Sequence, residues 1–117
     1  DALPISKEFL SKGELIYKNF TQLVMQNYNH TRNVAWYAKK LKISNIHLCT
    51  TVKKVTGNTC AEIIAHMVIM DAKSQLKSTH LSIQEISNSL NFANTSFFGK
   101  YFKRYVGMSP LTYRNNG

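Results

Sequence analysis

The sequence predicts an all-α fold. Signals for helix starts and ends recur along the 117 residues, whereas the two-residue alternation that is typical of β-strands is nearly absent. A further observation is a duplication, in which residues 34–57 and 83–107 share apolar positions over their first halves and basic positions over their second halves. Because two copies are too few for a repeat array, we expect about seven helices that form one paired module.

Capping residues place the individual helices. In a capping box, a Ser or Thr hydroxyl accepts an early backbone N–H and a Glu three residues later reaches back, and 59–62 and 82–85 both fit this pattern. The other capping candidates are Asn33, Asn94, Ser109, Gly57 and Gly107. The predicted helices are Lys12–Gln26, Val34–Lys40, Asn45–Thr56, Thr59–Ser78, Ile83–Ser89, Asn94–Tyr105 and Pro110–Asn115.

The two copies differ in length by one residue. Val34 aligns with Ile83 at a separation of 49, whereas Gly57 aligns with Gly107 at a separation of 50. We place the extra residue between positions 44 and 47, where a turn can absorb it.

Each repeat has the form of a helix-turn-helix, and its second helix has two contrasting faces. The inward residues are Leu48, Thr51, Val52 and Val55 in the first repeat and Phe98, Tyr101, Phe102 and Tyr105 in the second. The outward residues are Ile46, Cys49, Thr50 and Lys53 in the first repeat and Thr95, Ser96, Gly99, Lys100 and Lys103 in the second. A helix that is held by one face offers the opposite face to a partner, and the major groove of DNA is wide enough to admit it.

Positive charge is concentrated in the part of the chain that contains the repeats. The formal net charge is +9, and residues 1–31 contribute none of it because three Lys balance three acidic residues there. Residues 32–117 therefore hold twelve Lys and Arg against three acidic residues. Such a unit attracts a polyanion, which is DNA, RNA or an anionic membrane.

Several other classes are excluded by what the sequence lacks. Cys49 and Cys60 are eleven residues apart with no CxxC pair and no His at ligand spacing, so we expect reduced thiols, no metal site and no cofactor. No carboxylate pair, nucleophile with base or phosphate loop stands out, and we expect no enzymatic activity. The lack of a leader and of a long apolar run predicts a cytoplasmic location without membrane contact. Because the first residue is Asp1 and not Met, we expect a piece of a longer protein.

The run SIQEISNSLNFANTSFFGKYFKRYVGMSPLTYR resembles the second half of the DNA-binding domain of the AraC/XylS family of bacterial transcription regulators. The residues that carry the resemblance there are Ile83, Ile86, Leu90, Phe92, Ser96, Phe98, Phe102, Lys103, Gly107, Pro110, Tyr113 and Arg114. Upstream, the matching residues are Ala38, Leu41, Ser44, Leu48, Lys53, Lys54, Thr56, Gly57, Ala72, Lys73 and Leu76. The resemblance covers about residues 33–114 and leaves residues 1–32 uncovered.

This resemblance implies a sequence-specific domain of a transcription regulator that inserts two recognition helices into duplex DNA at a promoter or operator. The base-facing positions that it implies are Ile46, Cys49, Thr50, Thr95, Ser96, Gly99 and Lys100, which coincide with the outward faces. The residues that we assign to phosphate neutralisation are Lys53, Lys54, Lys103 and Arg104. The resemblance also implies a sensory or oligomerisation region upstream that receives an effector signal, with RNA polymerase as a candidate partner.

The outward faces depart from the commoner pattern of this family because neither contains an Arg. The first face can touch thymine methyl groups but makes few strong hydrogen bonds to base edges, so we expect its readout to be weak or based on DNA shape. Lys100 is the only strong donor among the base-facing positions and is our choice for a guanine contact. Gly99 within a helix costs about 1 kcal/mol relative to Ala, and we expect it to allow close approach to DNA.

The expected domain organisation follows from these elements. We divide the chain into a lead-in segment with its helix (1–32), a first helix-turn-helix subdomain (33–58), a connecting helix (59–78) and a second helix-turn-helix subdomain (79–117). The connecting helix would be roughly 30 Å long, and neighbouring major-groove segments on one face of DNA recur at about 34–36 Å. Because the length of the connecting helix is similar to the spacing of groove segments, we expect both recognition helices to engage adjacent segments.

Alternative interpretations concern the partner and some individual residues. A cationic RNA-binding module would expose aromatic residues for stacking, and a membrane-surface protein would gather Lys along one long amphipathic helix. The lead-in helix either packs on the first subdomain or mediates dimerisation. The aromatic and Met residues that we assign to the core or to subdomain packing, and not to a stacking platform, are Trp36, Tyr37, Met67, Met70, Phe92, Phe97 and Phe98.

Overall fold

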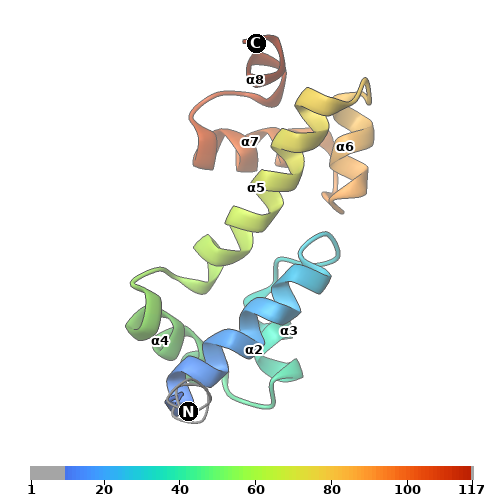
Figure 1. The fold of residues 1–117 in the computed structure, drawn as a ribbon. Coiled ribbons are helices and arrows are strands. Elements are labelled where there is room, and N and C mark those ends of the chain that lie inside the picture. The colour runs from blue at the N-terminus through green and yellow to red at the C-terminus, as the bar shows by residue number, and fades with distance from the viewer. Residues whose placement is uncertain (1–9, 117) are drawn as a thin grey trace, which may run out of the picture. The chain divides into compact units, whose positions relative to one another are not determined.

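The computed structural model describes residues 10–116, and every regular element in this range is a helix (Figure 1). The helices are α2 (Lys12–Asn27), α3 (Val34–Lys40), α4 (Asn45–Thr56), α5 (Cys60–Ser78), α6 (Ile83–Ser89), α7 (Thr95–Val106) and α8 (Pro110–Asn115). The predicted all-α class is confirmed. The described residues divide into two compact units, of which the first comprises 10–26 and 33–63 and the second comprises 27–32 and 64–116.

Side-chain caps fix the helix boundaries close to the predicted positions. The bounds of α3, α4, α6 and α8 are those predicted, whereas α5 and α7 each begin one residue later. They do so because Thr59 and Asn94 lie outside the helices as caps: the Thr59 hydroxyl accepts from Glu62 N at 3.1 Å, and the Asn94 amide oxygen accepts from Phe97 N at 2.9 Å. The predicted capping boxes at 59–62 and 82–85 are both formed, and a third, unpredicted one joins Ser11 to Glu14.

The two helix-turn-helix turns have the same backbone conformation until the residue before the next helix cap, where the second turn is one residue longer. Lys42 and Asn91 both have a φ of 60°, and the residues that follow them donate equivalent backbone hydrogen bonds to position 38 and position 87. The next cap is Ser44 in the first turn and Asn94 in the second, at a separation of 50. The extra residue is therefore Ala93, just before the cap, and the predicted position within 44–47 is wrong.

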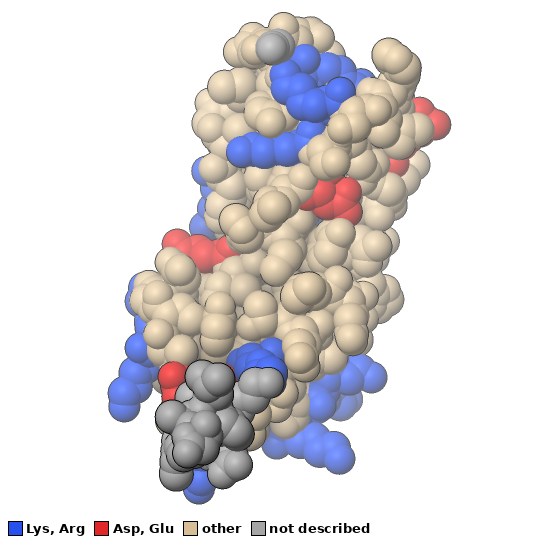
Figure 2. Space-filling model, in the orientation of Figure 1, with Lys and Arg blue, Asp and Glu red and all other residues tan. Residues whose placement is uncertain are grey.

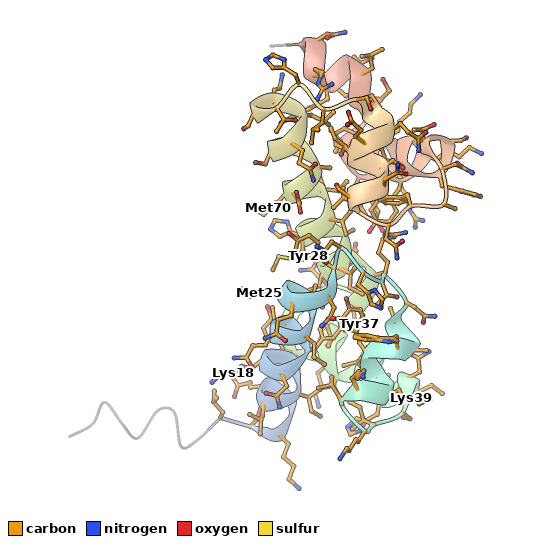
Figure 3. The ribbon with its side chains drawn as sticks, turned by 90° about the vertical axis from the view of Figure 1, so that its right-hand side faces the viewer. Lys18, Met25, Tyr28, Tyr37, Lys39 and Met70 are labelled. Atoms are coloured by element: carbon orange, nitrogen blue, oxygen red, sulfur yellow. The ribbon has the colours of Figure 1, made fainter. Side chains whose placement is uncertain are left out.

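The first unit is built around the contact between α2 and the first helix-turn-helix. Phe20 and Val24 of α2 are completely buried, and the rings of Phe20 and Tyr37 form a T-shaped contact with 5.6 Å between their centroids. At the start of α2, a Cβ on Gly13 would lie 3.4 Å from side-chain atoms of Thr51 and Val55. Figure 3 shows Tyr37 inside this unit and Lys39 pointing away from it. The lead-in helix thus packs on the first subdomain.

The second unit is organised by an aromatic cluster and by a partly buried arginine contact. The cluster links Phe92 to Phe98 at 5.2 Å, Phe98 to Phe102 at 6.0 Å and Phe102 to Tyr113 at 5.5 Å between ring centroids. Arg114 of α8 donates to the carbonyl oxygen of Leu76 at 2.9 Å and to that of Thr79 at 3.4 Å. The Leu76 carbonyl is one of the last four of α5, which have no partner within the helix, and the bond from Arg114 satisfies it.

The core assignment of two residues is wrong. Met70 on α5 and Phe97 on α7 are each 57% exposed, while their neighbours Ile69 and Phe98 are buried (Figure 3 labels Met70). Adjacent residues on a helix point about 100° apart, so each pair can present only one member to the core.

Candidate nucleic-acid interface

The outward face of α4 is exposed as predicted, and it is poor in free donors. Ile46 is 76% exposed, Thr50 and Lys53 are exposed, and Cys49 is half-buried. The Thr50 hydroxyl donates back to the carbonyl oxygen of Ile46 at 2.8 Å, so its proton is used within the helix. The apolar side chain and methyl groups that remain suit contact with thymine methyl groups more than hydrogen bonding to base edges.

The opposite side of α4 holds the helix in place. Leu48 and Val52 are completely buried in the first unit, and Ser44 caps the helix by accepting from His47 N at 3.0 Å. Gly57 ends it with a φ of 80°, a left-handed conformation that suits glycine. The exposed face is therefore fixed relative to the core of its own unit.

The outward face of α7 carries more hydrogen-bonding groups. Ser96, Lys100 and Lys103 are exposed, while Thr95 and Gly99 are half-buried. A Cβ built on Gly99 would meet no atom within 4 Å, so the packing of this unit does not require glycine there. The missing side chain instead leaves open space beside Lys100, as close approach to a partner would require.

The four basic residues assigned to phosphate lie at the C-terminal ends of the two recognition helices. Lys53, Lys54, Lys103 and Arg104 are all exposed. Lys53 also donates to the carbonyl oxygen of Gly57 at 2.9 Å. Its positive charge therefore lies at the C-terminal end of α4, where the helix dipole is negative. Figure 2 shows Lys and Arg gathered in several patches on the visible face, among far fewer Asp and Glu.

Two residues near α7 were missed by the sequence reasoning. Phe97 lies on the exposed flank of α7. It is not one of the inward positions 98, 101, 102 and 105, and this spacing could have predicted its exposure. Arg32 contacts the turn before α7, where its guanidinium lies 3.8 Å from the centroid of the Phe92 ring. No sequence signal indicates that contact, because the two residues are sixty positions apart.

The two cysteines differ in environment. Cys60 is 2% exposed, and burial, with a smaller contribution from the nearby Cys49 thiol, raises its pKa to about 12. Cys49 is half-buried on α4. Within residues 10–116, no three His, Cys, Asp or Glu side chains gather as a metal site would require, and no helix has the length and apolar character to cross a membrane.

Comparison with protein families identifies the duplicated unit. The family model described as "Helix-turn-helix domain" matches residues 37–116, which include both helix-turn-helix turns and α5 between them. The chain belongs to the AraC/XylS-type helix-turn-helix family. The resemblance found in the sequence is thereby confirmed.

Curated members of this family are similar over most of the chain. The Msm operon regulatory protein of Streptococcus mutans is 33% identical over 116 residues, which are 97% of this chain and 42% of that protein. The raffinose operon regulatory protein RafR of Pediococcus pentosaceus is 28% identical over 93 residues, which are 80% of this chain and 34% of that protein. The chain thus spans less than half the length of these relatives.

Solved structures share the fold. The C-terminal domain of AraT, a response regulator from Geobacillus stearothermophilus, has a TM-score of 0.83 at 23% identity, covering 92% of this chain and 89% of that one. The DNA-binding domain of AdpA, solved in complex with a target DNA, has a TM-score of 0.76 at 17% identity, covering 86% and 90%. The family and its relatives support a DNA-binding domain of a transcription regulator, not the alternative RNA-binding module.

Proposed function

We propose that this chain recognises duplex DNA by inserting α4 and α7 into adjacent major-groove segments. The observation that carries the proposal is the same arrangement in both copies. Each helix has two completely buried residues on one side, at 48 and 52 or at 98 and 102, and an exposed face on the other side. A helix that is anchored in this way is presented to a groove without further rearrangement.

Within this proposal, base reading and phosphate binding fall to different residues. Ile46, Cys49 and Thr50 would contact bases from α4, and Thr95, Ser96, Gly99 and Lys100 would contact bases from α7. Lys53, Lys54, Lys103 and Arg104 would bind phosphates, which sets affinity and salt dependence but carries no sequence information.

The two recognition helices would contribute unequally to specificity. Lys100 supplies a charged donor that can reach the acceptor groups of guanine, whereas α4 offers Ile46 and a Thr50 hydroxyl whose proton is already donated to its own helix. We infer that α7 carries most of the sequence discrimination and that α4 reads thymine methyl groups or groove shape.

The complete protein would be a bacterial regulator that acts in the cytoplasm, where the chromosome lies. The names of its relatives refer to operons, and we infer that the DNA partner is a promoter or operator. We infer that RNA polymerase is a candidate partner and that an effector signal would act through an upstream region of the complete protein. One relative, AdaA of Bacillus subtilis, is named a bifunctional transcriptional activator and DNA repair enzyme and is 28% identical over 94 residues. For this chain we propose DNA binding without catalysis.

Selection of bound duplexes from a random pool tests the proposal. We expect enrichment of a two-part motif with its halves about one helical turn apart. Ser96→Asp, which places a negative charge on the proposed interface, should abolish enrichment, whereas the matched change Ser74→Asp on an exposed position of α5 should not. Enrichment of a single short motif would contradict joint reading by both helices, and no enrichment would contradict specific binding altogether.

A further inference from the structure

Residues 27–32, which run from the end of α2 toward α3, belong to the second unit and are bonded to the turn of the second helix-turn-helix. Arg32 donates from Nη1 to the carbonyl oxygen of Leu90 at 2.9 Å and from Nη2 to that of Asn91 at 3.3 Å. From the turn, the Asn91 side-chain amide donates to the carbonyl oxygen of His30. The same turn is therefore held from two neighbouring residues of the segment.

The guanidinium of Arg32 suits this position for two reasons. Leu90 is the C-cap of α6, so its carbonyl lies at the negative end of the helix dipole, where a cation is stabilised. The planar fork donates to two successive carbonyl groups while its face covers the Phe92 ring, with 3.8 Å from Cζ to the ring centroid. A lysine ammonium is a point charge and cannot make the same set of contacts.

Phe92 connects this contact to the recognition helix. Its ring lies 5.2 Å from the centroid of Phe98 and 5.2 Å from that of Tyr101, both on α7. Phe98 is completely buried and fixes the side of α7 that faces the core. Ser96 and Lys100 lie on the opposite side of α7. If Phe92 shifted, α7 would rotate with it, and the direction of these two side chains would change.

We propose that Arg32 is a positioning residue for DNA recognition: by holding the turn at 90–92, it sets the orientation in which α7 presents Ser96 and Lys100 to the bases. This inference rests on the proposed function and adds a residue outside both recognition helices to it. A direct contact between Arg32 and a phosphate would be a different role, because it would depend on charge alone.

Arg32→Lys and Arg32→Met separate these roles. The test compares binding of the selected duplex with binding of the same duplex scrambled in the half that α7 reads. We expect both variants to lose about tenfold in this discrimination, which is the size of one good base contact, with an unchanged salt slope for Arg32→Lys. Lys18→Ala, which removes an exposed charge from α2, should leave the discrimination unchanged. Full rescue by Arg32→Lys, or an equal loss on both duplexes, would overturn the proposal.

A double-mutant cycle tests whether Arg32 acts through α7. If it does, Arg32→Lys should lower discrimination much less in a Lys100→Ala background than in the wild type. Independent, additive losses would contradict the proposal. Melting curves of each variant check that the second unit is folded.

Asn91→Gly gives a second test that keeps Arg32 intact. Asn91 has a φ of 60°, which glycine adopts readily, and the change removes only the side-chain bond to His30. We expect a smaller loss of the same discrimination, and this variant decides the matter if Arg32→Lys does not fold. A wild-type chain that shows no preference for the selected duplex would overturn the proposed function itself, whereas a preference that survives in all three variants would overturn only the role of Arg32.

Discussion

Ser87 occupies in the second repeat the position that Ala38 occupies in the first, and both side chains are buried. Ser87 is completely buried, and within residues 10–116 its hydroxyl is the buried side-chain group without a hydrogen-bond partner. The two copies otherwise make the same local bond, since the backbone carbonyl at each position accepts from the residue five positions later at 3.1 Å. The second repeat thus carries a polar group that the first shows to be unnecessary for the fold.

Ser87→Ala should stabilise the protein by about 1 kcal/mol, because burying an unpaired hydroxyl costs free energy that a methyl group does not. Urea unfolding of the variant and the wild type measures the difference. The reverse change in the other copy, Ala38→Ser, should destabilise the protein. A loss of stability in Ser87→Ala would show that the hydroxyl has a bonding partner.

Gly99→Ala should raise stability and lower DNA affinity at once. A Cβ at this position meets no packed atom within 4 Å beyond its chain neighbours and the backbone of its own helix, so the gain should approach the roughly 1 kcal/mol by which Ala exceeds Gly in a helix. If the helix approaches DNA closely there, the same methyl group will collide with it. Ser74→Ala on α5 is the control, with no expected effect on binding. Undiminished affinity in Gly99→Ala would contradict close approach.

Lys100→Ala and Lys103→Ala should differ in what they lose, because the first is assigned to a base and the second to a phosphate. For Lys100→Ala we expect discrimination between matched and scrambled duplexes to fall by about tenfold. For Lys103→Ala we expect all duplexes to bind more weakly and the salt slope to fall by about one. Titrations at several salt concentrations measure both quantities, and the same loss in both variants would remove the distinction.

Stability should decline at alkaline pH through Cys60. Its pKa is about 12 in the folded chain and near the ordinary 9.0 in the unfolded chain, so between these values the folded state retains a proton that the unfolded state releases. The stabilisation is complete below pH 9 and is lost as the pH rises toward 12, by at most about 1.4 kcal/mol per pH unit. Urea unfolding between pH 7 and pH 10.5 should show a steeper decline in the wild type than in Cys60→Ala.

Cys49→Ala is the matched control for that measurement. Because Cys49 is only the smaller cause of the raised pKa, this variant should keep most of the decline. Equal slopes in the wild type and Cys60→Ala would mean that the Cys60 thiol ionises as readily in the folded chain as in the unfolded one.

Spacing between the two half-motifs should matter for binding. Insertion of about five base pairs rotates one half by half a helical turn relative to the other, so both recognition helices could no longer face their grooves. We expect the loss of high-affinity binding in a gel-shift titration. Base substitutions in the spacer at constant length are the control, and unchanged affinity after the insertion would contradict simultaneous engagement.

Local chemistry explains why so much of the helical fold was predictable. Asn33, Asn94 and Ser109 cap helices because their short polar side chains reach nearby backbone N–H groups. The buried pairs at 48 and 52 and at 98 and 102 follow from helical periodicity alone. The faces proposed to contact DNA were predicted by the same periodicity, because they consist of the helix positions that do not face the core.

The sequence by itself determined the duplicated helix-turn-helix, its caps and its two exposed faces, because those features depend on residues within about one turn of each other. Only the tertiary structure decided that Arg32 binds the turn at 90–91 and that the Ser87 hydroxyl is buried without a partner. Those features depend on which segments meet across the chain, and the free energy of such contacts comes from packing and desolvation that no short pattern of residues records.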